Sequence, residues 1–533
     1  NDKAPGTPPE IPPNGVVGAV SDASGARVGG GIIYFVPAAD VAALPATTVE
    51  VGSANDEPLE DLVAASGASY AQAAVGADGA YRLETLPQGS YFVTFVPAAG
   101  DAAHLPGGNA CRKAKSSGEL VGTRLDLEVS AATPADATFV GSGKCAGCHA
   151  DQVNSEKVTM HRLGIWSPYE AGPMQDFSVR QAELFQALTQ KFEANGGAGT
   201  TIYFFGYDQT RGFDKYRTSE TDPGAGVSLT VRVFKDAADQ KYKMELKNVK
   251  NPGVGDAVHT VDAVYGGGVK KQRYMTKLTA PDGGFYYALL PLQFQHDGNE
   301  GAAYGRTSKV WRDYHAAKWY DDAAGTFKAY TVKDSFEKNC LSCHANGAVV
   351  TGSDATNWTA SLVRDATWGD WDYGDQGTPA EVNQGCENCH GPGSAHVAAG
   401  GGAGRFIVTP ALLTPEREAM LCGQCHSRPK GAFNTDSPLN AAGEMMIAGT
   451  SRNTFLTEYA TSQLDGAASD YYADEHKHSK SHHQQYSDYI RSSMYKNGSE
   501  LMTCTGCHDP HGRPNHRQLH ADPTNNAALC GSC

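Results

Sequence analysis

The stretch that decides the fold of this chain is "LMTCTGCHDPHG", residues 501–512. Two residues separate Cys504 from Cys507, and His508 follows the second cysteine directly. Cysteine pairs with this spacing occur in zinc sites, in redox-active dithiols and in covalent cofactor attachment sites. One copy leaves all three interpretations open, so the presence or absence of further copies decides between them.

The pattern C-x-x-C-H occurs five times in the chain. Its cysteines are Cys145, Cys148, Cys340, Cys343, Cys386, Cys389, Cys422, Cys425, Cys504 and Cys507, and its histidines are His149, His344, His390, His426 and His508. This pattern is typical of c-type haem attachment, because two thiols bond to the porphyrin and the adjacent histidine ligates the iron. We therefore expect five covalently bound haems.

The two alternatives explain the repetition less well. A zinc site needs four ligands, and it does not require a histidine after every cysteine pair. A thioredoxin-like dithiol is usually single and lies in a βαβ unit. Five copies in a chain with 13 cysteines disfavour both alternatives.

The chain ends in "LCGSC", which supplies Cys530 and Cys533 without the following histidine. We expect the full protein to continue with histidine and to bind a sixth haem at these two cysteines. The alternative is a disulfide, either between Cys530 and Cys533 or from one of them to Cys111. Otherwise Cys111 is expected to be a buried thiol.

Composition and charge limit the classes of function. A chain of 533 residues with 40% hydrophobic residues suits a protein of about two to four domains. The formal charge of −15 argues against a nucleic-acid partner and leaves room for cationic partners or metal ions. The sequence lacks an apolar run long enough for a transmembrane helix. It begins at Asn1 without a leader, which favours a processed mature form.

The pattern along the chain predicts several domains. Residues 1–15 are proline-rich and read as an extended linker, and residues 16–140 contain short alternating strands between glycine-containing turns. Residues 141–533 carry all the haem motifs, with a cysteine-free β-rich insertion at 200–295. The expected fold class is therefore an N-terminal all-β sandwich followed by a loop-rich, mostly short-helical multihaem domain.

Local patterns predict individual elements in the first part of the haem region. Apolar residues near helical spacing indicate a helix at 178–195, and Asp282, Gly283 and Gly284 indicate a hairpin turn. The segments that favour strands are 201–208, 228–236, 241–248 and 284–294.

The chain has 18 histidines, of which five follow the motif cysteines, so others are available for the far faces of the irons. A second histidine makes a haem iron six-coordinate and leaves no position for substrate. The candidates are His161, His315, His396, His511 and one of the neighbours His482 and His483. His511 stands three residues after His508, too close to reach the same iron, so we expect it to reach a neighbouring haem.

The other histidines and the methionines have weaker claims. His476 and His478 are expected to face solvent, and the methionines of the haem-rich segments are expected to be packing residues while histidine is in excess. The sequence leaves five histidines undecided: His104, His259, His296, His516 and His520.

Residues 335–533 resemble multihaem cytochromes c. The strings that carry the resemblance are "NCLSCHANG", "GCENCHGPGSAHV", "LCGQCHSRPKG", "SHHQQYSDYIRSSMY" and "TCTGCHDPHG". The resemblance implies electron transfer between the cell and acceptors outside it, and some relatives stack their haems in filaments called cytochrome nanowires. Residues 16–140 resemble carboxypeptidase-regulatory-like or transthyretin-like β-sandwich domains. Covalent haem c is assembled outside the cytoplasmic membrane, so we expect an extracytoplasmic protein, at the cell surface or extracellular rather than periplasmic.

The function that we expect is electron transfer, without catalysis, through five to six haems that are mostly ligated by two histidines. The expected partners are redox proteins or extracellular acceptors, with self-association into a filament as a further hypothesis. The alternative is a multihaem reductase or oxidase of small nitrogen or sulfur compounds with one open iron. The C-x-x-C-K motif of multihaem nitrite reductases does not occur in the chain, which disfavours that alternative. A third hypothesis makes the sandwich domain the main part of an adhesin or matrix protein.

Overall fold

The structure of the protein is a computed structural model. It describes residues 10–47, 56–268, 270–296, 309–374, 377–431, 433, 437–460, 471–473, 478–480, 483–512 and 518–521. Cys530, Cys533 and His482 lie outside the described residues, so the expectations for the sixth haem and for His482 stay predictions. Among the described residues, no helix is both long and apolar enough to cross a membrane.

The chain divides into two compact units. One comprises Asn1–Val140 together with Cys386–Cys533, and the other comprises Gly141–Gly385. The first unit is therefore discontinuous in sequence, because the last three described motifs pack with the N-terminal strands. The sequence pattern grouped 141–533 as a single region, which differs from this division.

The N-terminal part of the first unit contains two four-stranded sheets. In the first, β1 pairs antiparallel with β4 and parallel with β7 and β8; in the second the order is β3-β2-β5-β6. Alternating residues such as Ile33, Phe35, Val93 and Phe95 are fully buried in a core shared with Val16 of β1. The strands are β1 (Val16–Asp22), β2 (Ile32–Pro37), β3 (Ala71–Ala74), β4 (Ala80–Leu83), β5 (Ser90–Val96), β6 (Lys115–Ser116), β7 (Thr123–Arg124) and β8 (Leu127–Val129).

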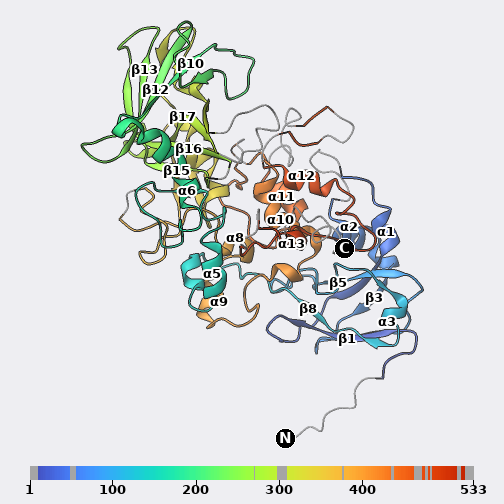
Figure 1. The fold of residues 1–533 in the computed structure, drawn as a ribbon. Helices are drawn as coiled ribbons and strands as arrows, with labels where there is room; N and C mark the ends of the chain where they lie inside the picture. The colour runs from blue at the N-terminus through green and yellow to red at the C-terminus, as the bar shows by residue number, and fades with distance from the viewer. Residues whose placement is uncertain are drawn as a thin grey trace. The chain divides into compact units, whose positions relative to one another are not determined.

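Short helices make up most of the regular structure elsewhere in the first unit (Figure 1). A second core, which includes Met420, Phe455, Tyr486 and Ile490, packs α10 against α11 and α12. The helices are α1 (Ala38–Ala42), α2 (Pro58–Ser66), η1 (Gly67–Ser69), α3 (Ser117–Leu120), α8 (Cys386–His390), α9 (Ser394–Ala398), η8 (Pro410–Leu412), α10 (Pro415–His426), α11 (Arg452–Glu458), α12 (Gln485–Ile490) and α13 (Cys504–Cys507).

Buried polar contacts join the N-terminal segment of the first unit to its C-terminal segment. The Glu416 carboxylate accepts hydrogen bonds from the backbone N–H groups of Leu59 (3.0 Å) and Glu60 (2.9 Å) at the start of α2. Glu57 in turn accepts from the backbone N–H of Arg452 (2.6 Å) at the start of α11. Carboxylates at helix N-termini satisfy donors that the helix itself leaves without partners. These bonds fix α10, which carries one haem motif, to the N-terminal part of the chain.

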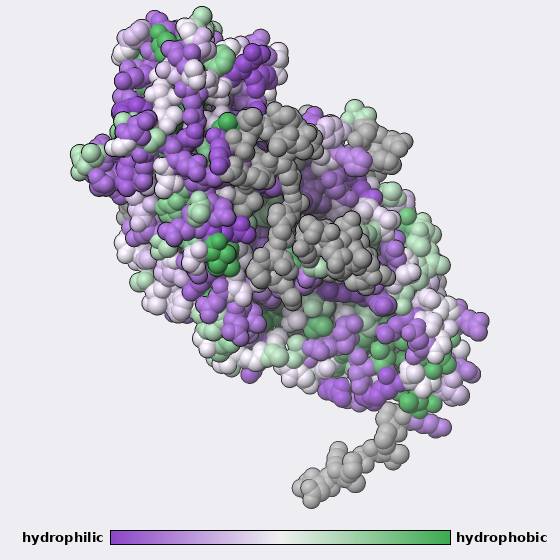
Figure 2. Space-filling model, in the orientation of Figure 1, coloured by the Kyte–Doolittle hydropathy of each residue, from purple (hydrophilic) through white to green (hydrophobic). Residues whose placement is uncertain are grey.

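The second unit is built around two five-stranded antiparallel sheets, with orders β11-β10-β12-β13-β14 and β18-β17-β16-β15-β9. Figure 2 shows a largely hydrophilic surface in this part of the molecule. Among the exposed apolar residues of this unit are Val254 and Val258. The strands are β9 (Ile165–Trp166), β10 (Thr200–Phe205), β11 (Arg217–Ser219), β12 (Val227–Lys235), β13 (Tyr242–Asn248), β14 (Ala257–Thr260), β15 (Ala263–Tyr265), β16 (Lys271–Thr279), β17 (Phe285–Gln295) and β18 (Val310–Asp313).

Smaller elements complete the second unit. Two short hairpins pair β19 (Tyr320–Asp321) with β20 (Thr326–Phe327) and β21 (Val349–Gly352) with β22 (Trp358–Ser361). The helices are α4 (Ser142–Cys145), α5 (Ala150–Glu156), α6 (Gln181–Leu184), η2 (Leu188–Phe192), η3 (Ala194–Gly197), η5 (Ala316–Lys318), η6 (Val332–Asp334), α7 (Phe336–Asn339) and η7 (Leu341–His344).

The strands expected in the insertion are confirmed as β10, β12, β13 and β17. The predicted hairpin turn joins β16 to β17: Gly283 has a φ of +87°, and the N–H of Ala280 donates to the carbonyl of Gly284 at 2.8 Å. The sheets extend beyond 200–295, because β9 and β18 lie outside that range.

The helix expected at 178–195 is confirmed in part. Helical structure runs from α6 to η2 with one turn residue, Phe185, between them, and η2 is a wider π-helical stretch that is followed by η3. The N–H of Thr189 donates to the carbonyl of Phe185 at 2.9 Å, so the helix continues past that turn. The Phe185 ring contacts Trp166 at 5.0 Å, and the Phe192 ring contacts Tyr242 and Tyr274 at 5.6 and 5.4 Å.

Candidate haem-binding sites

Each described C-x-x-C-H motif lies on a single helical turn. The backbone N–H of His149 donates to the carbonyl of Cys145 at 2.8 Å, and that of His508 donates to Cys504 at 2.9 Å. Residues three apart on a helical turn lie on one face, so the two thiols of each motif point to the same side. This local structure suits a cofactor that bonds to both cysteines.

Three motifs come together in the first unit. The side chain of Cys504 hydrogen-bonds that of Cys422, and this contact, together with burial and the nearby Cys389, raises the pKa of the Cys422 thiol well above its usual value. His508 also lies close enough to His426 to lower the pKa of that imidazole, although burial is the larger cause. Cysteines from motifs separated by up to 115 residues in sequence therefore share one small region.

Helix α10 holds the C-terminal motif beside its own. The carboxylate of Glu418 on α10 accepts hydrogen bonds from the hydroxyls of Thr503 (3.0 Å) and Thr505, and it forms an ion pair with Arg112. Thr503 immediately precedes α13, so these bonds fix Cys504 and Cys507 against α10. In Figure 1, α10, α12 and α13 lie together, and α10 packs against both other helices.

His390 has the ring of His511 as a neighbour. The two ring centroids are 6.1 Å apart and the ring planes are 12° from parallel. The Nδ1–H of His390 donates to the backbone carbonyl of Val408 at 2.9 Å. A hydrogen bond at Nδ1 selects Nε2 as the metal-ligating nitrogen and fixes the ring orientation.

His426 has a similar neighbour in His483. Their ring centroids are 6.4 Å apart, with the planes 72° apart. The Nδ1–H of His426 donates to the side-chain oxygen of Gln485 at 3.1 Å. His483 has a φ of +60°, a conformation that is uncommon for a residue with a side chain and is found more often at functional sites.

Both centroid distances fit a pair of histidines on opposite faces of one metal ion. A metal–imidazole bond is about 2 Å long and the bonding nitrogen lies about 1 Å from its ring centre, so two such rings have centroids about 6 Å apart. Each pair joins the histidine of one motif to a histidine from another part of the chain. The structure thus places His483 beside His426 and His511 beside His390, and the role of His483 and His511 as iron ligands stays a prediction.

In the second unit, aromatic rings surround the motif of Cys340, Cys343 and His344. The His344 ring contacts Tyr265 at 4.9 Å and Phe336 at 6.1 Å. Burial, with Arg273 and His161 nearby, lowers the pKa of His344 to about 4. His161 is therefore a neighbour of His344, and the low pKa favours the neutral imidazole that ligates iron.

Arg273 on β16 is a buried cation beside the same motif. Its guanidinium stacks over Tyr314 at 4.1 Å and over Tyr265 at 5.2 Å, and its exposed fraction is 9%. Among the described residues, no carboxylate pairs with it. A buried charge normally has a partner of opposite charge. A haem propionate would supply that partner, so this residue fits a haem bound at Cys340 and Cys343.

Close packing around the second unit's motifs depends on two glycines. A Cβ on Gly164 would stand 3.3 Å from His344 Nδ1, and a Cβ on Gly143 would overlap the Trp368 side chain at 1.8 Å. Gly143 precedes Cys145 by two residues, so its backbone rests directly on the indole. His149 of this motif is exposed and begins α5.

The remaining predicted ligands lie in different surroundings. His315 is partly buried, its φ is +60°, its ring contacts Tyr314 at 4.5 Å and Phe213 at 5.5 Å, and burial lowers its pKa to about 3. His396 on α9 donates from Nδ1 to the carbonyl of Arg405 at 2.8 Å. The structure does not pair either residue with a motif histidine by a ring contact, so their role as iron ligands stays a prediction.

Cys111 is a fully buried free thiol, and its Sγ hydrogen-bonds the carbonyl of Leu413 at 3.4 Å. This environment agrees with the buried-thiol interpretation of the sequence. Sequence reasoning missed Arg273 and Gln485. The sequence could have indicated Arg273, because it is an arginine within a strand whose other residues are mostly buried. Nothing in the sequence indicated the role of Gln485.

Comparison with known proteins supports the motif interpretation. A family described as "Doubled CXXCH motif" matches residues 496–533, a span that contains Cys504, Cys507 and His508 and extends to Cys530 and Cys533. No curated protein matches the chain. Among solved structures, the chain is similar to the outer cell wall cytochrome OcwA with 17% identity and a TM-score of 0.37, over 74% of this chain and 67% of that one.

The doubled-motif match and the repeated C-x-x-C-H motifs together indicate a multihaem c-type cytochrome. Haem in a protein of this class is bound covalently through the motif cysteines.

Proposed function

We propose that this protein carries electrons outside the cytoplasm through five to six covalently bound haems, most of them ligated by two histidines. The observation that carries the proposal is the spacing of the pairs His390–His511 and His426–His483. Histidine on both faces closes an iron to substrate, and an iron of that kind exchanges electrons only. Bound haem supplies the one-electron redox step.

The protein's own groups orient the ligating histidines and tune the reduction potential of that step. The Val408 carbonyl and the Gln485 side chain hold Nδ1 of His390 and His426 and so direct Nε2 to the metal. Hydrogen bonds of this kind also make the imidazole a stronger electron donor. Histidine rather than methionine as the second ligand favours a low reduction potential.

The spacing of the motifs supports transfer within the molecule. Cys422 interacts with both Cys504 and Cys389, so the groups attached to these three cysteines would be close neighbours. Glu418 keeps two of these motifs together through Thr503 and Thr505. A rigid arrangement fixes the distance and orientation between redox centres, which is the protein's main contribution to electron transfer.

The extracytoplasmic location follows from the covalent attachment, since haem c is joined to its protein outside the cytoplasmic membrane. The net charge of −15 suits cationic or metal-containing acceptors and disfavours nucleic acid. Redox proteins or extracellular acceptors are the proposed partners, at the cell surface or beyond it. Assembly into a filament is part of the same proposal, and electron micrographs of the concentrated protein test it directly.

A specific observation favours the enzyme alternative at one motif. His149 is exposed, and no described histidine ring contacts it. An iron held there would have an open face if no other ligand reached it, and open irons bind small nitrogen or sulfur compounds. Electron transfer remains the proposed function because the two histidine pairs lie at motifs of the other unit.

Voltammetry of the complete haem-loaded protein on an electrode tests the proposal. A carrier gives reversible waves at low potential that are unchanged by nitrite, hydroxylamine or sulfite. A catalytic current with one of these compounds would replace the proposal with the reductase alternative. Intact mass of the same sample gives the number of haems, and a value of four or fewer contradicts the count proposed here.

A further inference from the structure

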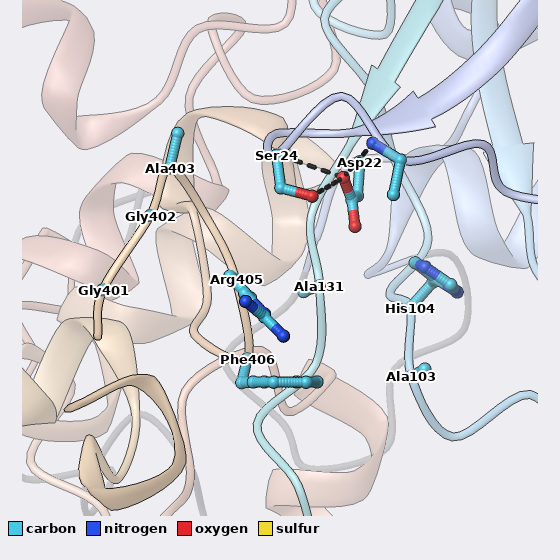
Figure 3. A pocket seen from close by; sticks show the side chains of 11 residues that line it. Asp22, Ser24, Ala103, His104, Ala131, Gly401, Gly402, Ala403, Arg405 and Phe406 are labelled. Carbon is cyan, nitrogen blue, oxygen red and sulfur yellow. Dashed lines mark hydrogen bonds between the residues drawn. The ribbon is translucent and has the colours of Figure 1, made fainter. Parts of the chain in front are cut away.

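A cavity of about 580 Å³ lies within the first unit, and one of its walls is a loop that follows the motif of Cys386, Cys389 and His390 in sequence. Its walls are the turn after β1, the segment around His104 and the glycine-rich loop at 401–406 (Figure 3). Ligand sites in proteins commonly have volumes of about 300–1,000 Å³. The cavity is therefore large enough for a ligand of one or two rings.

The loop that forms one wall is held in place. The carbonyl of Arg405 accepts the hydrogen bond from His396, which anchors the loop to α9. Gly404 has a φ of +58°, and a Cβ there would stand 2.4 Å from the Cβ of Ala23. Only glycine allows the loop to rest so closely on the turn after β1, so this wall of the cavity is formed before any ligand arrives.

Phe406 presents an aromatic face at the cavity. Its φ is +57°, its exposed fraction is 41%, and the Arg405 guanidinium lies 5.1 Å from its ring centre. A bulky residue with positive φ is an outlier, and such residues cluster at ligand-binding sites. Figure 3 shows the ring as one side of the cavity with Arg405 beside it.

Polar groups of both signs face the same space. The Oδ1 atom of Asp22 accepts from the N–H and hydroxyl of Ser24 (2.9 and 2.6 Å) and from the N–H of Ala26 (2.9 Å). These bonds fix the carboxylate and leave Oδ2 without a hydrogen bond from a described residue. Arg405 forms no ion pair with a described carboxylate, and His104 is oriented by Asp101 through Nδ1 (2.9 Å).

We propose that this cavity binds an acidic sugar, the hexuronate unit of an extracellular polysaccharide. The C–H face of a sugar ring packs on the Phe406 ring, and the guanidinium of Arg405 binds the uronate carboxylate with two parallel hydrogen bonds. Sugar hydroxyls donate to the carboxylate of Asp22. A neutral sugar offers Arg405 no carboxylate, and a simple carboxylate gives Asp22 no hydroxyl, so the combination favours a hydroxylated acid.

Calorimetry with the complete haem-loaded protein at low salt tests this assignment. The probes are trigalacturonate and sodium glucuronate, with glucose and acetate as controls for the ring and the charge. We expect the two uronates to bind and the two controls to bind at least about tenfold more weakly, since each lacks one set of contacts. No binding of either uronate, or equal binding of glucose or acetate, overturns the proposal.

Variants locate the site. Arg405→Ala and Phe406→Ala should each weaken trigalacturonate binding by about tenfold or more. Arg217→Ala removes an exposed arginine of the second unit and should leave binding unchanged, although the net charge changes equally. Arg405→Ala keeps the carbonyl that His396 uses, so its visible spectrum should match the parent protein. Unchanged uronate binding in Arg405→Ala overturns the proposal. The voltammetry tests the electron-transfer function separately, so its result does not depend on this site.

Discussion

The rings of His426 and His483 are neighbours with centroids 6.4 Å apart, although 56 residues separate them in sequence. His426 belongs to a C-x-x-C-H motif at the end of α10, and His483 lies just before α12, which packs against α10. The contact between α10 and α12 therefore brings His483 beside His426. His511 lies beside His390 from the turn that follows α13.

His483→Ala should open one iron. Because the second imidazole is lost, the ferrous protein should bind carbon monoxide at about one haem equivalent, measured from the visible difference spectrum. His483→Met should instead keep that iron six-coordinate and raise its potential, since methionine is the weaker donor. The neighbouring change His482→Ala is the matched control, and carbon monoxide binding there rather than in His483→Ala would contradict the pairing.

His511→Ala should open the iron held by His390 and leave the iron of its own motif closed. Removing Cys386 and Cys389 as well deletes that haem, so the combined variant should bind no carbon monoxide. Intact mass confirms the loss of one haem in the combined variant. Persistent carbon monoxide binding in the combined variant would mean that His511 serves a different haem.

Arg273→Gln should lower the reduction potential of one haem. The buried guanidinium favours the reduced form, which carries one more negative charge, and its removal also leaves a propionate without a partner. A buried charge interaction of about 1–2 kcal/mol corresponds to a shift on the order of 60 mV for one electron. A spectroelectrochemical titration measures it. Arg273→Lys keeps the charge and should restore most of the potential, while equal shifts in both variants would argue for a packing effect.

The stability of the first unit should fall as pH rises from about 5 to 8. Burial, with Glu60 nearby, raises the pKa of Glu416 to about 8 and that of Glu57 to about 7. The folded state then holds protons that the unfolded state has already released, so raising the pH disfavours folding. Each group contributes at most about 1.4 kcal/mol per pH unit, and the two titrate together.

Glu416→Gln tests this pH dependence. Glutamine keeps the oxygen that accepts from Leu59 and Glu60, but it cannot ionise. Thermal unfolding followed by the far-ultraviolet dichroism should show the parent losing stability above about pH 6 and the variant losing less, with little difference at pH 5. A steeper loss in the variant would contradict the assignment.

Local sequence patterns predicted the strands and the hairpin turn, because these elements are determined by residues that are close together in the chain. The alternation in 228–236 and 241–248 predicted β12 and β13, and the Asp-Gly-Gly run predicted the β16–β17 hairpin. The helix expected at 178–195 is present over 181–192 but is interrupted at Phe185 and widened in η2, and local apolar spacing does not predict such irregularities.

The candidate haem sites could likewise be predicted only in part. The motif cysteines and histidines are visible in sequence because attachment chemistry fixes their spacing. The partners of those histidines are not visible in sequence, since the pairs His390–His511 and His426–His483 join residues that are 121 and 57 positions apart in the chain. Arg273 was missed because its significance depends on burial beside Cys340, which sequence alone does not reveal.

The most direct test of the account is the visible spectrum of the reduced, complete protein before and after carbon monoxide. Irons with histidine on both faces have no position for the gas, so the account predicts an unchanged spectrum. A shift equal to about one haem equivalent would show an open iron, with the haem at Cys145 and Cys148 the first place to look. That result would contradict the carrier function and put the reductase alternative in its place.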